Sequence, residues 1–133
     1  MTLTPINSGW IEVICGNMFS GKTEELIRRI RRAQIAKMST SIFKPKIDSR
    51  FGKDHIVSHN QEKMKSCTID KPSDMLKLVN KTQVIGIDEA QFFDESLIDI
   101  SKILASRGKR IIIAGLDTDY RGTPFGPMPG IMC

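Results

Sequence analysis

Gly16-Asn17-Met18-Phe19-Ser20-Gly21-Lys22-Thr23 is the stretch that decides the fold of this chain. It fits the pattern G-x-x-x-x-G-K-[ST], the phosphate-binding loop called Walker A. The amides of such a loop point inward and bind phosphate, and the positive end of the following helix adds to the attraction. The lysine reaches the β- and γ-phosphates, and the threonine hydroxyl holds Mg²⁺. We therefore expect all eight residues to bind a nucleoside triphosphate, with Thr23 also a Mg²⁺ ligand.

The segments on either side of this loop fit a strand–loop–helix unit. Residues 10–15 are β-prone, and residues 21–37 read as a helix. The apolar residues of this helix recur at helical spacing and should face a sheet; they are Leu26, Ile30 and Ala33. Its basic residues should fall mostly on the opposite, solvated face; they are Arg28, Arg29, Arg31 and Arg32. Two i,i+4 ion pairs are expected on this helix, namely Glu24 with Arg28 and Glu25 with Arg29.

Further along the chain, strand-like and helix-like segments alternate. The expected strands are 39–44, stopped by Pro45, then 84–87 and 110–114. The expected helices are 72–79 and 96–107, and residues 55–58 and 64–69 suggest two short strands or a hairpin. Residues 45–55 and 115–130 read as loops. This order predicts one domain over residues 1–133, an α/β fold of P-loop type whose open, mostly parallel sheet has helices on both faces.

Asp88 and Glu89 directly follow the apolar segment Val84–Ile87, which reads as a strand buried on both faces. An aspartate in this place is typical of a Walker B acid near Mg²⁺, and the adjacent glutamate can activate water or accept a proton from a substrate hydroxyl. Ligands of open parallel sheets bind at the carboxyl ends of the strands. The phosphate loop, the acidic pair and the loop after Gly115 should therefore meet in one crevice.

Composition narrows the classes of function. A net charge of +5 can indicate a nucleic-acid partner, but the basic residues are spread over helices, so we expect no nucleic-acid binding. No apolar run approaches the ~18 residues of a membrane span, and the N-terminus has no signal-peptide pattern, so we expect a cytoplasmic protein without membrane contact. Three cysteines without C-x-x-C spacing disfavour a disulfide framework. His55 and His59 lack partners for a metal site.

Three motifs together closely resemble the type II thymidine kinases, the zinc-containing cytosolic kinases of bacteria and animals. They are Met18–Thr23, Asp88–Phe93 and Gly115–Pro127. The resemblance runs from about Gly9 to the end of the chain, and the last two motifs are far more specific than the Walker loop. It implies an enzyme that transfers the γ-phosphoryl group of ATP, with Mg²⁺, to the 5′-hydroxyl of thymidine.

The resemblance also assigns roles to residues. It makes Glu89 the catalytic base, Asp88 the acid near Mg²⁺, and Arg50 a group near the transferring phosphate. Ala90 and Gln91 join the acidic pair among the ATP-binding residues. The nucleoside-binding positions are Met18, Asp48, Phe92, Leu116 and Tyr120, where Tyr120 replaces a more usual phenylalanine. From the residues alone, core packing is the preferred interpretation of Phe92 and Leu116.

The family continues beyond Gly126–Pro129 into a zinc-binding subdomain with cysteine pairs and a lasso loop over the nucleoside. This chain ends at Cys133 without either cysteine pair, so we expect a truncated form that lacks the structural zinc ligands. Such a chain should bind Mg·ATP but phosphorylate thymidine poorly. The family tends to form tetramers, which implies a homo-oligomer. Two alternatives stay open at this stage: a P-loop ATPase of another kind, in which Glu89 activates water, and a non-catalytic nucleotide-binding module.

Overall fold

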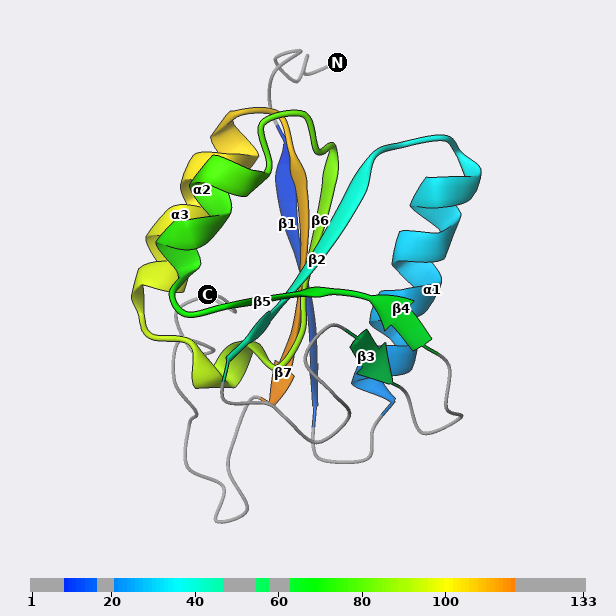
Figure 1. Cartoon of the computed structure of the whole chain (residues 1–133), viewed down its shortest axis with the longest axis horizontal. Coiled ribbons are helices and arrows are strands. Elements are labelled where there is room, and N and C mark those ends of the chain that lie inside the picture. The colour runs from blue at the N-terminus through cyan, green and yellow to red at the C-terminus, as the bar shows by residue number, and fades with distance from the viewer. Residues whose placement is uncertain (1–8, 17–20, 47–54, 58–62, 117–133) are drawn as a thin grey trace, which may run out of the picture.

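The computed structural model describes residues 9–16, 21–46, 55–57 and 63–116 of the chain. Its centre is a five-stranded, entirely parallel sheet with the strand order β1-β7-β6-β2-β5 (Figure 1). The strands of this sheet are β1 (Trp10–Gly16), β2 (Thr40–Pro45), β5 (Cys67–Ile69), β6 (Val84–Ile87) and β7 (Arg110–Leu116). Two further strands, β3 (His55–Val57) and β4 (Lys63–Lys65), form a separate antiparallel pair.

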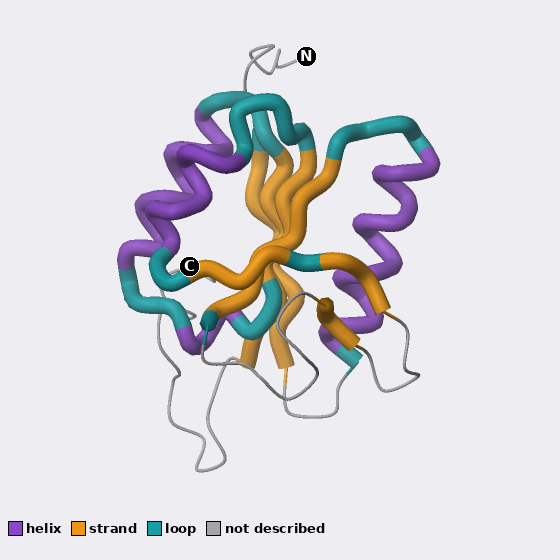
Figure 2. Tube along the Cα trace, in the orientation of Figure 1, coloured by secondary structure: helices purple, strands orange, loops and turns teal. Residues whose placement is uncertain are grey.

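Helices cover both faces of the large sheet, as Figure 2 shows. The helix α1 (Lys22–Ile35) lies on one face. The opposite face carries α2 (Met75–Leu78), which follows the 3-10 turn η1 (Pro72–Asp74), and α3 (Ser96–Ser106). A second 3-10 turn, η2 (Ala90–Phe92), follows β6. The predicted open parallel sheet with helices on both faces is confirmed.

Alternating side chains of the strands divide the core into two halves. On β7, Ile111 and Ile113 belong to the core under α2 and α3, whereas Ile112 and Ala114 belong to the core under α1. The α1-side core consists of Leu26, Ile27, Ile30, Ala33, Ile42, Val84, Ile112 and Ala114. Because both halves are apolar, the central strands are buried on both sides, as a parallel sheet requires.

Gly86 on β6 lets α1 approach the sheet closely. A Cβ atom at this position would stand 3.1 Å from Leu26 Cδ1 and 3.2 Å from Ile30 Cδ1. The missing side chain therefore brings the helix that follows the phosphate loop near the strand that precedes Asp88.

Most predicted boundaries hold, but three segments differ. Pro45 is the last residue of β2, whereas the sequence predicted that the strand stops before it. The pairing with β5 extends this far: Pro45 lies opposite Ile69, and the carbonyl of Ile69 accepts the N–H of Lys46. The expected strand 64–69 is split: β4 pairs with β3, whereas β5 joins the large sheet beside β2. Residues 115 and 116 continue β7, because the strand pairs with β1 as far as Gly16.

The polar face of α1 also differs in detail from the expectation. Glu25 pairs with Arg29 as predicted, but Arg28 pairs with Glu25 at i,i+3 instead of with Glu24. The side chain of Arg29 is only 29% exposed, because it reaches Glu12 on β1 instead of lying on the solvated face. Within the described residues, no helix is both long enough and apolar enough to cross a membrane.

Candidate active site

The first turn of α1 begins at a glycine in a left-handed conformation. Gly21 has φ 78° and ψ 24°, and its carbonyl accepts the N–H of Glu25 at 3.0 Å. A glycine has no side chain with which to cap the first amides of a helix. Those amides and the positive end of the helix dipole are therefore suited to an anion such as phosphate. Lys22 is the first residue of the helix and adds a full positive charge there.

Thr23 and Asp88 meet at the carboxyl end of the sheet although 65 residues separate them. The hydroxyl Oγ1 of Thr23 lies 3.4 Å from Oδ1 and 3.3 Å from Oδ2 of Asp88. Asp88 directly follows β6, is 6% exposed, and donates its N–H to the carbonyl of Phe43 at 2.9 Å. The structure thus brings the end of the phosphate loop and the predicted Walker B acid together.

This pair of oxygen ligands fits Mg²⁺. The ion prefers hard oxygen ligands, keeps several waters, and commonly takes only one or two protein ligands beside substrate phosphates. A hydroxyl and a buried carboxylate at contact distance supply that set. In the described part of the chain, no group of three or more His, Cys, Asp or Glu residues is placed to hold a metal ion.

Glu89 is held in an unusual backbone conformation beside Asp88. Its φ of 52° and ψ of 42° lie in the left-handed region, which costs a non-glycine residue about 1–3 kcal/mol and recurs at active sites. Its N–H donates to Asp88 Oδ1 at 3.0 Å, and its own Oε2 accepts a hydrogen bond from Gln91 Nε2 at 2.8 Å. Gln91 therefore orients the half-buried carboxylate of Glu89, while the backbone of Glu89 is bonded to the carboxylate of Asp88.

The residues after Glu89 divide between the core and the surface. Ala90 is fully buried in the core under α3, so its side chain packs there, and Gln91 is buried as the partner of Glu89. Phe93 is 4% exposed, but Phe92 is 41% exposed. Core packing, the interpretation favoured by the residues alone, is therefore wrong for Phe92.

Several predicted site residues lie outside the described part of the chain. These are Asn17, Met18, Phe19, Ser20, Asp48, Arg50 and Tyr120. For two others the structure describes the backbone: Gly16 ends β1 and pairs in register with Leu116, which ends β7. Both stand at the same edge of the sheet as Asp88.

Lys44 is a charged residue of this edge that the sequence reasoning missed. It lies in the last part of β2, and its side chain is among the largest fully buried ones, at 2% exposure. Phe43 pairs with Ile87, so Lys44 occupies the strand position beside Asp88. The only sequence signal was a lysine directly after an apolar strand and before Pro45.

A pocket of about 400 Å³ lies between the end of β1 and the first turns of α1. Its walls include Ile14 and Cys15 of β1, and Gly21, Lys22 and Glu25 of the helix start. Lys22 thus lines a pocket that residues of β1 close on one side.

Comparisons with known proteins show the family of this chain. A protein-family profile described as "Thymidine kinase" matches residues 9–133. The thymidine kinase of Rhodothermus sp. (strain ITI 518) is 54% identical over 124 residues, which cover 93% of this chain and 58% of that protein. Thymidine kinases of Porphyromonas gingivalis strains ATCC 33277 and W83 are each 54% identical over 126 residues, which cover 95% of this chain and 62% of the relative.

The chain therefore spans about three fifths of the length of these curated relatives. The profile covers nearly all of the chain, including the phosphate loop, the acidic pair and the segment after Gly115. The chain belongs to the thymidine kinase family.

Proposed function

We propose that this protein transfers the γ-phosphoryl group of ATP to the 5′-hydroxyl of thymidine. The observation that carries the proposal is the contact of Thr23 with the buried Asp88, made at the carboxyl edge of the sheet in a chain of the thymidine kinase family. The named relatives are thymidine kinases, which supports thymidine as the acceptor.

The donor phosphates would bind at the start of α1. The uncapped amides after Gly21 and the ammonium group of Lys22 offer positive charge to the β- and γ-phosphates. Thr23 and Asp88 would hold Mg²⁺, which neutralises charge on the phosphates when it is bound. The surrounding fold keeps these groups in place before the nucleotide arrives, which lowers the cost of binding.

Glu89 would orient the acceptor and take its proton. Its carboxylate is held by the hydrogen bond from Gln91, one residue away from the Asp88 that faces Thr23. A carboxylate so placed can accept the proton of the thymidine 5′-hydroxyl while that oxygen attacks the γ-phosphorus. The transition state of phosphoryl transfer is loose, so positioning and electrostatics supply most of the rate.

The direct test is to incubate the protein with Mg·ATP and thymidine and to separate the nucleosides from the nucleotides. The proposal expects thymidine monophosphate and ADP in equal amounts, however slow the turnover of this chain. ADP formed at the same rate without thymidine, with no thymidine monophosphate, would contradict it and favour an ATPase in which water is the acceptor.

A further inference from the structure

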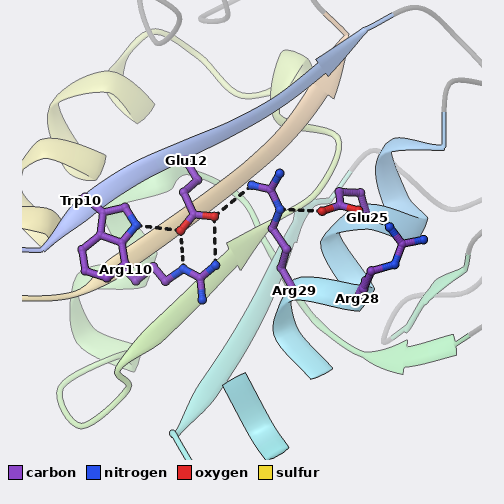
Figure 3. A network of polar contacts seen from close by, with 6 residues as sticks. All are labelled: Trp10, Glu12, Glu25, Arg28, Arg29 and Arg110. Carbon is purple, nitrogen blue, oxygen red and sulfur yellow. Dashed lines mark hydrogen bonds and ion pairs between the residues drawn. The ribbon is translucent and has the colours of Figure 1, made fainter. Parts of the chain in front are cut away.

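A chain of ion pairs joins the strand before the phosphate loop to the helix after it (Figure 3). On β1, the carboxylate of Glu12 accepts hydrogen bonds from Nε and Nη2 of Arg110 and, at 2.7 Å, from Nε1 of Trp10. Arg29 on α1 donates from Nη1 to Glu12 Oε1 at 2.9 Å and from Nε to Glu25 Oε2 at 2.8 Å. One guanidinium group thus bridges two carboxylates on different elements.

The charged groups in this chain of ion pairs stabilise one another. Burial opposes the ionisation of Glu12, but hydrogen bonds from Arg110 and Trp10 and the charges of Arg110 and Arg29 lower its pKa below the ordinary value. The hydrogen bond from Arg29 is the main cause that lowers the pKa of Glu25, and the same bond raises the pKa of Arg29. All three groups are therefore charged at neutral pH, and the bridge persists there.

The bridge ends in the turn of helix that carries the phosphate-binding residues. Glu25 lies two positions after Thr23, and its N–H bonds to Gly21. On the other side of this turn, Thr23 contacts Asp88 after β6. The first turn of α1 is consequently held from two directions, by β6 through Thr23 and by β1 through Arg29.

Arg29 joins two elements of the fold, whereas the neighbouring Arg28 does not. Arg28 also pairs with Glu25, at 2.5 Å, but its side chain is 58% exposed and this pair stays within one helix. Exposed ion pairs of that kind contribute little to the free energy of folding. Arg29 is half as exposed, and its planar group presents two nitrogens at once, which a lysine cannot do.

We propose that Arg29 is a positioning residue for the nucleotide site: by bridging Glu12 and Glu25 it fixes the first turn of α1, and with it Lys22 and Thr23, against the sheet. The inference rests on the proposed function in one respect, namely that Lys22 and Thr23 bind the Mg·nucleotide. Small displacements of binding groups are costly, because a shift of about 1 Å can lower the rate by about 10²-fold.

The test measures Mg·ADP affinity by calorimetry in Arg29→Gln, at a temperature well below its unfolding transition. The expected result is affinity weakened by about tenfold, with a smaller loss in Arg29→Lys, which keeps the charge but not the fork of nitrogens. Arg32→Gln is the matched control, because it removes the same charge from an exposed position of the same helix and should stay within about twofold of wild type.

The outcomes separate positioning from mere stabilisation. If folded Arg29→Gln bound Mg·ADP like the wild type and lost only thermal stability, the bridge would be structural and the positioning role overturned. If Arg29→Gln did not fold, unchanged affinity in Arg29→Lys would overturn it equally. A wild-type protein that did not bind Mg·ADP would contradict the proposed function itself, which distinguishes the two failures.

Discussion

The two ends of the parallel sheet satisfy their polar groups in different ways. At the amino end, Lys109 is 8% exposed, and its ammonium group donates to the carbonyls of Thr82 at 2.7 Å and Asn80 at 3.3 Å. Burial, together with the charge of Arg107, lowers the pKa of Lys109. The partners of Lys109 are neutral carbonyls of a short connection, so these contacts tie the connection to the sheet.

The carboxyl end instead gathers acidic and basic side chains around an uncapped helix. Asp88 is buried against Thr23, Lys44 is buried at the neighbouring strand position, and Glu89 is kept in a left-handed conformation. Such an arrangement raises the free energy of the folded chain locally, and it persists only where the surrounding structure enforces it. One end of the sheet thus serves stability, and we propose that the other serves a ligand.

Glu89→Gln should have the largest effect, because it removes the proposed base without changing the shape of the side chain. A positioned base contributes about 10²–10⁴-fold, and the loose transition state of phosphoryl transfer favours the lower end. We expect kcat for thymidine phosphorylation to fall by about 10²-fold while ATP affinity is kept. Steady-state kinetics check this, with the exposed Glu95→Gln as control. A kcat within about threefold of wild type would rule Glu89 out as the base.

Lys22→Ala should have the next largest effect, on binding. Hydrogen bonds to charged groups contribute about 1.5–3 kcal/mol, so Mg·ATP affinity should weaken by roughly 10–10²-fold. Titration with a fluorescent ATP analogue measures the change, and the exposed Lys102→Ala should bind like the wild type. Equal affinity in both variants would remove the phosphate-site assignment.

Lys109→Met should have the smallest effect on function and a clear one on stability. The substitution leaves the carbonyls of Thr82 and Asn80 without this donor, and the free energy of unfolding should fall by about 1–3 kcal/mol. Urea unfolding measures the loss, with Lys102→Met as control. Mg·ADP affinity should stay within about twofold of wild type. A loss of affinity as large as that of Lys22→Ala would break the division between the two ends.

The sequence predicted those features that local patterns encode. The Walker motif between a β-prone segment and an amphipathic helix located the phosphate loop, and the apolar run before Asp88 located the central strand. The rule that parallel strands gather ligands at their carboxyl ends then predicted that Thr23 and Asp88 lie in one crevice, and they are in contact.

The features that the sequence did not reveal depend on distant pairing. Glu12 and Arg110 are 98 residues apart, and only the register of β1 with β7 brings them together. Arg29 looked like one of several solvated arginines, because helical spacing cannot show which of them meets a neighbouring strand. The burial of Lys44 likewise follows from its neighbours β5 and β6. The nucleoside side of the site was predicted from resemblance, and Asp48 and Tyr120 lie outside the described residues.

The most direct test of the metal–nucleotide site compares ADP affinity with and without Mg²⁺ in wild type, Asp88→Asn and Lys109→Met. If Thr23 and Asp88 form the metal–nucleotide site, Mg²⁺ should strengthen ADP binding to the wild type and to Lys109→Met alike. The gain should be smaller by about tenfold in Asp88→Asn, which keeps the size of the side chain but loses its charge. An equal Mg²⁺ dependence in wild type and Asp88→Asn would contradict the account.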